Sequence, residues 1–324
     1  MIIARSPLRI TLGGGGTDLP SYYRLHGGFL IAGAINKHVY VSVNRTFNTD
    51  LILRYSQLER VQSPTEIRHP LIREALLLVG IHERNIEITT MADIPAGTGL
   101  GSSGSFGTAL LKALLRYRNQ TISQHELAEM ACHLEIDVLQ EPVGKQDQYA
   151  ATCGGLNCYE FLPDDRVRVS PLRISEETLK HWDEHVVFFC TGVTRSASSI
   201  LRHQVDQTRE GDRAMLDNLH AVKELGYRSR EALEQGDLEG FAGLMHEHWE
   251  RKRTRSGGIS NPDIERWYAL ALENGALGGK LIGAGGGGFL MFYAADPLRV
   301  RDAMHREGLM ELRCTFDYEG TKIL

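Results

Sequence analysis

Glycine and hydroxyl residues gather in one segment whose composition suits the binding of a phosphate group. The segment lies between an expected strand and an expected helix, and its candidate binding residues are Pro95, Gly97, Gly99, Leu100, Gly101, Ser102, Ser103 and Gly104. Glycine lets the backbone approach a ligand closely, and the free N–H groups at a helix N-terminus attract an anion. A flexible turn capped by serine is the alternative. The length and composition of the segment favour a nucleotide-phosphate loop.

Two other phosphate-binding patterns do not fit the sequence. The common P-loop ends in G-K-[ST], and no lysine follows the glycines of this segment. The dinucleotide pattern G-x-G-x-x-G fails in the first glycine cluster, Gly13 to Gly16, because Asp18 stands where the third glycine is needed. Hydride-transfer chemistry therefore gains no support.

Three charged residues have the chemistry for proton transfer and metal binding. Asp147 lies in the segment PVGKQDQ, Glu135 lies beside the apolar stripe of an expected helix, and Arg9 follows an early proline. Taken alone, each has a plainer explanation: a turn carboxylate, a half-buried glutamate with a hydrogen-bond partner, and a surface ion pair. Residue types alone leave these alternatives open.

Composition describes a folded enzyme rather than a nucleic-acid or membrane protein. The 324 residues are 42% hydrophobic and 24% charged, which is enough to bury substantial cores in two domains. The formal net charge of -5 gives no general basic field for DNA, and no apolar run reaches membrane-spanning length. Five scattered cysteines without a C-x-x-C pair indicate reduced thiols. Together with an N-terminal stretch that lacks a signal-peptide core, they predict a cytoplasmic protein.

Periodicity divides the chain into two mixed lobes. Alternating apolar residues predict neighbouring strands at 39–43 and 51–55 and a further strand at 86–88, followed by helices at 106–117 and 123–138. In the second half, the pattern predicts a strand at 186–190, a long charged helical region at 213–253, a helix at 264–274 and a strand at 289–293. We therefore expect an N-terminal domain of residues 1–160 and a C-terminal domain of residues 161–324.

Three motifs in order resemble those of the GHMP kinases, the family of galactokinase, homoserine kinase, mevalonate kinase and phosphomevalonate kinase. They are SPLRITL with Thr17-Asp18, P-x-x-x-G-L-G-S-S from Pro95 to Ser103, and GAGGGGF from Gly283 to Phe289. The resemblance implies an α+β protein with the two-domain GHMP kinase fold. Its N-terminal domain would be ribosomal-protein-S5-like and bind ATP, and its C-terminal domain would be ferredoxin-like, with the active site between them.

The resemblance also implies a role for each candidate residue. Asp147 would orient or deprotonate the attacking hydroxyl, and Arg9 would face it as the second catalytic residue. Ser103 and Glu135 would bind Mg²⁺, the cofactor expected beside ATP. The residues expected to bind the substrate are Gly15, Gly16, Thr17, Asp18, Gly286 and Gly287.

The run RITLGGGGTDLPSYY most resembles D-glycero-D-manno-heptose 7-phosphate kinases, which implies phosphorylation of the anomeric O1 to the 1,7-bisphosphate in nucleotide-heptose biosynthesis. A phosphorylated substrate needs basic contacts, and the candidates are Lys145, Arg195, Lys252, Arg253 and Arg255. Most of the segment RKRTR, and the nearby His246-Glu247-His248, are expected on a solvated helix face. A fucose-type sugar-1-kinase and a non-catalytic sugar sensor remain alternatives, and a homodimer remains open.

Overall fold

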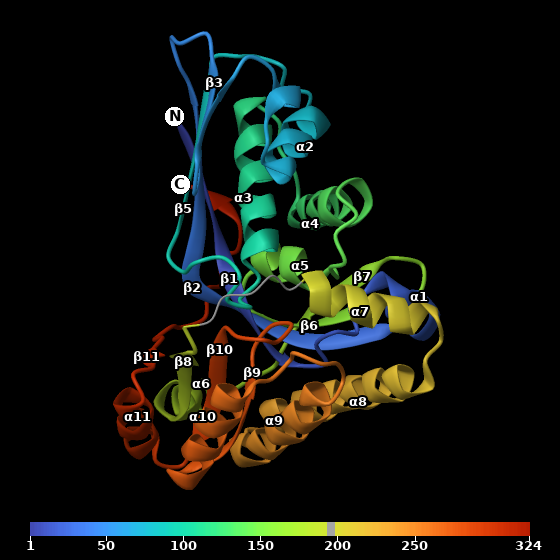
Figure 1. Cartoon of the computed structure of the whole chain (residues 1–324), viewed down its shortest axis with the longest axis vertical. Helices are drawn as coiled ribbons and strands as arrows, with labels where there is room; N and C mark the ends of the chain where they lie inside the picture. Colours follow the sequence, from blue (N-terminus) through green and yellow to red (C-terminus); the bar gives the residue numbers. More distant parts are fainter. Residues whose placement is uncertain (193–197) are drawn as a thin grey trace.

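The computed structural model describes residues 1–192 and 198–324, which form two sheets with helices packed on each (Figure 1). The first sheet has eight strands and the second has four. In Figure 1 the first sheet runs up the tall part of the molecule, and the second lies below it among the orange and red helices. Two lobes of mixed helix and sheet agree with the α+β, two-domain organisation expected above.

One long strand organises the first sheet. β2 (Gly28–Arg45) pairs with β1 (Ile2–Gly13) along most of its length, with β6 (Leu156–Phe161) over its first part and with β5 (Ile86–Ala92) over its last part. The other strands are β3 (Leu51–Arg54), β4 (Leu58–Val61), β7 (Val167–Pro171) and β12 (Lys322–Ile323). The register of β1 against β2 shifts between Thr11 and Gly13, where β1 ends at the cleft described below.

Helices lie beside this sheet. Two of them, which begin at Ser102 and Gln146, start next to the cleft described below. α2 (Pro70–Val79), α3 (Ser102–Tyr117) and α4 (Gln124–Cys132) stack alongside the sheet in Figure 1. α4 starts with a capping box between Ser123 and Glu126. The remaining helical segments are α1 (Pro20–His26), the short 3₁₀ helix Pro64–Glu66, the π-helix His133–Val138 and α5 (Gln146–Cys153).

The second sheet has the ferredoxin-like arrangement expected from the sequence. Its strands are β8 (Val186–Cys190), β9 (Ala276–Leu281), β10 (Phe289–Ala294) and β11 (Met310–Glu311), in the spatial order β11-β8-β10-β9 with antiparallel pairs. Its helices are α6 (Glu176–His185), α7 (Ser198–Arg209), α8 (Arg213–Gln235), α9 (Leu238–Arg253), α10 (Pro262–Glu273) and α11 (Pro297–Arg306).

Three sequence expectations about elements need correction. The strands predicted as neighbours, β2 and β3, are separated by β5, because β3 pairs with β5 in parallel. The helical region 213–253 breaks into α8 and α9 at Gly236, whose φ of 76° ends the first helix. The helix expected over 123–138 is α-helical only to Cys132. It continues as the π-helix His133–Val138, which includes Glu135.

One hydrophobic cluster spans both lobes. It contains Leu8 and Phe29 from the first sheet together with Trp182, Phe188 and Phe241 from the second lobe, all buried. The first sheet also continues beyond residue 160 through β7, and it is joined by β12 from the far end of the sequence. Because these contacts are apolar and close-packed, the lobes hold a fixed cleft between them.

Candidate active site

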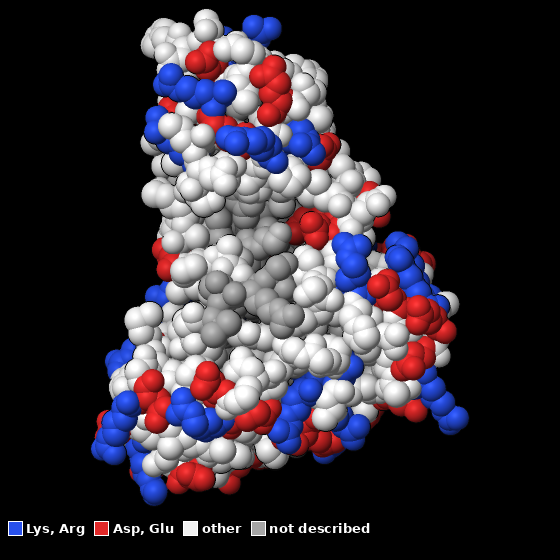
Figure 2. Space-filling view, in the orientation of Figure 1, with Lys and Arg blue, Asp and Glu red and all other residues white. Residues whose placement is uncertain are grey.

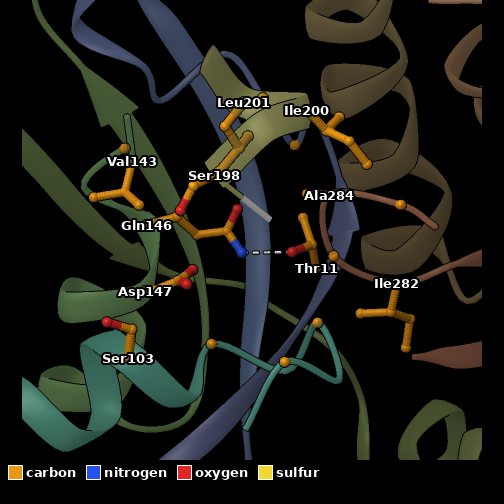
Figure 3. A pocket seen from close by; sticks show the side chains of 18 of the residues that line it. Thr11, Ser103, Val143, Gln146, Asp147, Ser198, Ile200, Leu201, Ile282 and Ala284 are labelled. Atoms are coloured by element: carbon orange, nitrogen blue, oxygen red, sulfur yellow. Dashed lines mark hydrogen bonds between the residues drawn. The ribbon is translucent and has the colours of Figure 1, made fainter. Parts of the chain in front are cut away.

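A cleft of about 530 Å³ lies where the two lobes meet. One wall comes from the first lobe: the end of β1, the loops before α1 and α3, and the start of α5. The other wall comes from α7, α9, β9 and the glycine loop that follows β9. In Figure 3, Ser103 and Asp147 lie together on one side of the cleft, and Ile282 and Ala284 lie across from them.

The loop before α3 forms a concave backbone surface at a helix N-terminus. Gly97, Gly99 and Gly101 all have φ near 80°, a left-handed conformation that side chains rarely adopt. Left-handed residues that alternate with residues of negative φ turn N–H groups to one side, and α3 begins directly after Gly101, at Ser102. This segment therefore has the geometry of an anion site, as its composition suggests.

The glycine loop before α3 and the glycine loop after β9 pack backbone against backbone. A Cβ atom added at Gly283 would lie 2.4 Å from the Cα of Gly99, and one added at Gly288 would lie 2.2 Å from the carbonyl oxygen of Thr98. Side chains at these positions would push the loops apart. The glycines of the second loop thus fix the width of the cleft at the phosphate end.

Asp147 and Arg9 form an ion pair at the centre of the cleft. The Arg9 Nε donates to Asp147 Oδ1 at 2.8 Å, and an Nη nitrogen lies 2.7 Å from the same oxygen. The other Nη donates to the carbonyl oxygen of Gly99 at 2.6 Å, so one guanidinium joins the carboxylate to the glycine loop. A Cβ at Gly104 would lie 2.6 Å from that of Asp147, which makes glycine necessary for this approach of α3 to α5.

Ser103 and Glu135 meet beside this pair. Ser103 Oγ donates to Glu135 Oε2 at 2.5 Å, and Gln148 Nε2 donates to the other oxygen at 2.9 Å. Glu135 is 2% exposed, and burial raises its pKa to about 7, although both hydrogen bonds oppose the shift. The hydroxyl of Ser103 and the carboxylate of Glu135 are oxygen ligands that fit Mg²⁺. This ion keeps several water and phosphate ligands and needs few from the protein.

Asp18 joins the first glycine cluster to α5. Its two carboxylate oxygens accept from the backbone N–H groups of Gly16 and Gln146, each at 3.2 Å. A Cβ at Gly144 would lie 2.0 Å from Asp18 Oδ2, so only glycine leaves room there. Burial, and then the nearby charge of Asp147, raise the pKa of Asp18. Asp18 lines the cleft with Gly15 and Gly16 and also holds the start of α5 in place.

The predicted residues separate into those that line the cleft and those that support it. Thr17 is fully buried, and its hydroxyl donates to the carbonyl oxygens of Gly14 and Phe29, inside its own loop. The predicted residues that line the cleft are Arg9, Gly15, Gly16, Asp18, Gly97, Gly99, Gly101, Ser102, Ser103, Asp147 and Gly287. Those outside the lining are Pro95, Leu100, Gly104, Thr17, Glu135 and Gly286.

The opposite wall carries basic side chains, which the sequence alone could not rank as phosphate ligands. Lys252 and Arg255 line the cleft, together with His248 and Lys280. Lys252 and Arg255 were candidate phosphate contacts, and both line the cleft, whereas the expectation of a solvated face is wrong for His248, which is 5% exposed. α9 turns Lys252 and His248 inward, while Glu247, the residue before His248, forms ion pairs with Arg228 and Arg251 at the surface.

Three other predicted phosphate ligands do not face the cleft or cannot be placed. Lys145 Nζ donates to Glu129 at 2.9 Å and to the carbonyl oxygen of Asp165, behind the start of α5. Arg253 pairs with Glu250 and Glu265, each at 2.6 Å. Arg195 lies outside the described residues.

Burial and mutual repulsion shift the basic groups of this wall. The pKa of Lys280 falls to about 7 through burial and then the charge of Arg9. Burial also lowers the pKa of Lys252 and of His248 well below their usual ranges, and the charge of Lys280 adds to both shifts. Burial lowers the pKa of Arg255 to about 10.

Sequence reasoning missed Lys280, His248, Gln146 and Gln204 as lining residues. Gln146 donates to the Thr11 hydroxyl across the cleft floor (Figure 3). Lys280 had a signal: a lysine inside a strand next to Leu281 and Ile282 must be buried or at an edge. The two glutamines have no such signal, because polar residues are common both at helix starts, as at Gln146, and within helices, as at Gln204.

Sequence models of two domains match the chain. The model for the GHMP kinases N-terminal domain matches residues 70–155, and the model for the GHMP kinases C-terminal domain matches residues 229–309. The first match contains the phosphate loop, Glu135 and Asp147. The second contains the basic wall and the glycine loop after β9.

Curated proteins and solved structures resemble the chain along its length. It is 30% identical to the D-glycero-alpha-D-manno-heptose 7-phosphate kinase of Campylobacter jejuni, over 99% of this chain and 98% of that protein. It is 29% identical to an L-fucokinase/L-fucose-1-P guanylyltransferase of Bacteroides fragilis, over 92% of this chain but only 35% of that protein.

Two structures share the fold. A D-glycero-D-manno-heptose 1-phosphate kinase of Bacteroides thetaiotaomicron superimposes with a TM-score of 0.80 at 24% identity, covering 100% of this chain and 99% of the other. The galactokinase of Lactococcus lactis, crystallised with galactose, gives 0.78 at 17% identity, covering 100% and 95%.

Proposed function

The chain belongs to the GHMP kinase family and is an ATP-dependent sugar kinase, and from this premise we propose that it phosphorylates the anomeric O1 of D-glycero-D-manno-heptose 7-phosphate. The observation that carries the proposal is the meeting, in one cleft, of the glycine loop before α3 with the Asp147–Arg9 pair. The product would be the 1,7-bisphosphate, a precursor for nucleotide-activated heptose.

The nucleotide would occupy the end of the cleft formed by the first lobe. Left-handed glycines and the N-terminus of α3 suit the triphosphate. Beyond them, the lining side chains Pro70, Leu71 and Phe106 form an apolar wall against which a base can pack. This placement directs the terminal phosphate toward Asp147.

Asp147 would accept the proton of the attacking hydroxyl or orient that hydroxyl for in-line attack. Its carboxylate is partly exposed to the cleft, with 29% of the side chain accessible, whereas the side chain of Arg9 is 8% exposed. The ion pair fixes the carboxylate, and the guanidinium lies where it can stabilise charge on the transferring phosphoryl group. Both roles need the glycine at position 104 to keep α3 and α5 close.

Ser103 and Glu135 would hold Mg²⁺ beside the nucleotide phosphates. The bound ion would neutralise phosphate charge during transfer. Glu135 would lose the proton that its raised pKa favours, and Gln148 keeps the carboxylate oriented toward Ser103.

The heptose phosphate is favoured over a free sugar by likeness along the whole chain to the kinase of Campylobacter jejuni. Asp18, with Gly15 and Gly16 beside it, would contact sugar hydroxyls, because all three residues line the cleft. All five cysteines are free thiols, which agrees with a cytoplasmic reaction at the site of ATP supply.

A phosphoryl-transfer assay tests the proposal. The purified protein is incubated with ATP, Mg²⁺ and one sugar at a time: D-glycero-D-manno-heptose 7-phosphate, the same heptose without phosphate, L-fucose or galactose. We expect the largest kcat/KM with the heptose 7-phosphate, and NMR of the product should locate the new ester at O1. A preference for L-fucose would replace the proposal with a fucose-type kinase, and binding of ATP without transfer to any of them would indicate a sensor.

A further inference from the structure

We propose that Lys252, Lys280 and Arg255 form a phosphate subsite that holds a phosphomonoester carried by the acceptor sugar, on the second-lobe wall of the cleft beside Gly16. The inference deepens the proposed function and rests on it. It assigns the residues that would make a sugar phosphate, rather than a free sugar, the substrate.

Each of the three cations is held by neutral oxygen atoms. Lys252 Nζ donates to the carbonyl oxygens of Leu281, at 2.8 Å, and Gly283. Lys280 Nζ donates to the carbonyl oxygen of Leu12 at 2.7 Å. Within residues 1–192 and 198–324, no carboxylate forms an ion pair with either lysine or with Arg255.

Arg255 is bound in the same way and keeps one nitrogen available. Its Nε donates to Asn218 Oδ1 at 2.8 Å, and Nη1 donates to Gln204 Oε1 at 3.3 Å. Its other nitrogen, Nη2, is buried and has no hydrogen-bond partner. A buried donor without a partner costs free energy, and a phosphate oxygen would satisfy it.

Cations elsewhere on the same elements are paired with carboxylates. On α9, Arg253 contacts Glu250 and Glu265, and Arg251 contacts Glu247. Figure 2 shows the same mixture over the surface in view, where blue and red side chains alternate at both ends of the molecule. On α9, the cations outside the cleft lining therefore have carboxylate partners, whereas Lys252 in the lining is held by carbonyl oxygens.

The buried charges repel one another. His248 lies with them in the lining, and the charges that shift its pKa, Lys280, Arg255 and Lys252, are all positive. Burying like charges without a counter-ion is unfavourable. A phosphate dianion would supply the missing negative charge and match both the ammonium groups and the guanidinium fork.

Contacts place this subsite on the acceptor side. A Cβ at Gly16 would lie 2.8 Å from Arg255 Nη1, and Gln204 Nε2 donates to the Gly16 carbonyl oxygen at 2.9 Å. Gly16 in turn donates to Asp18, the residue expected to contact the sugar. Lys280 reaches Leu12, next to Thr11 on the cleft floor. Only Lys252, through Gly283, also approaches the nucleotide loop.

The test compares two arginines of the same segment. Arg255→Gln removes the cation from the subsite, and Arg253→Gln is the matched control because its guanidinium faces Glu250 and Glu265 outside the cleft lining. Each variant is assayed with heptose 7-phosphate and with the same heptose lacking the phosphate. We expect Arg255→Gln to raise the KM for the sugar phosphate roughly 10–100-fold, the loss expected for hydrogen bonds to a charged group.

The KM for ATP and the kinetics with the unphosphorylated heptose should stay near wild-type values in Arg255→Gln, and Arg253→Gln should match the wild type throughout. Equal losses with both sugars, or a loss confined to ATP, would overturn the subsite. If Arg255→Gln unfolds at a lower temperature than the wild type, Arg255→Lys keeps the charge, and it should recover part of the affinity for the sugar phosphate.

Calorimetric titration without ATP separates this inference from the kinase assignment. Heptose 7-phosphate should bind the wild type more tightly than the unphosphorylated heptose, and Arg255→Gln should abolish the difference. Such binding without phosphoryl transfer would refute the proposed reaction and leave the subsite standing. Transfer with no preference for the phosphorylated sugar would do the reverse.

Discussion

The two walls of the cleft treat charge in opposite ways. On the first-lobe wall, Arg9 is paired with Asp147, and Glu135 with Ser103 and Gln148. On the second-lobe wall, the partners of Lys252 and Lys280 among the described residues are all carbonyl oxygens. A paired wall keeps its geometry whether or not a ligand is bound, whereas an unpaired wall is stabilised only when an anion arrives. The Asp147–Arg9 pair and the proposed phosphate subsite therefore lie on different lobes.

The largest expected effect comes from breaking the paired wall at its centre. Asp147→Asn keeps the shape of the side chain but removes its ability to accept a proton. We expect kcat to fall roughly 10²–10⁴-fold, the usual contribution of a general base, with ATP affinity close to normal. Steady-state kinetics and ATP titration measure the two quantities. Asp164→Asn, at an exposed ion pair with Arg166, is the control, and wild-type turnover in Asp147→Asn would remove the role assigned to this carboxylate.

A smaller effect is expected at the metal pair. Glu135→Gln should raise the Mg²⁺ concentration needed for half-maximal activity roughly 10–100-fold, and Ser103→Ala should raise it less, because the carboxylate contributes the charge. With the pKa of Glu135 near 7 in the ligand-free protein, Mg²⁺ must displace a proton below that pH. The wild type should therefore need more Mg²⁺ as the pH falls from 8 to 6.

Metal titrations at several pH values measure this requirement, and Glu135→Gln should remove its dependence on pH. Glu87→Gln, on β5 and paired with Arg54, is the control. Unchanged titrations in both Ser103→Ala and Glu135→Gln would exclude these residues as ligands.

The smallest effect concerns stability and tests the unpaired wall. The folded pKa of Lys280 is about 7, below its ordinary value of 10.5, so between these values the unfolded chain binds more protons than the folded one. This group's contribution to the free energy of unfolding is present above pH 10.5 and is lost as the pH falls toward 7. Urea denaturation of the ligand-free protein between pH 7.5 and 10 should show a shallower pH dependence in Lys280→Met than in the wild type. Equal slopes would mean that Lys280 is not a buried, unpaired cation.

The two walls also differ in how far the sequence predicted them. Glycines, serines and Asp147 on the first-lobe wall fall in short contiguous motifs, so residue types and family resemblance locate them together. His248 and Lys280 come from a helix and a strand 32 positions apart, and no local pattern links them. The expected surface position of His248 was wrong, because the burial of a polar helix face depends on the lobe packed against it. Fold class followed from the motifs, whereas strand order did not: the position of β5 between β2 and β3 depends on long-range pairing.

One pairing described above governs the order in which the molecule can be built. Arg5 on β1 aligns with Lys322 on β12, so the outer neighbour of the first strand is synthesised only after the ferredoxin-like lobe. During translation β1 must wait, with one edge open, while the rest of the chain emerges. A chain without β12 would therefore expose that edge, and deletion of residues 322–323 should increase chaperone binding.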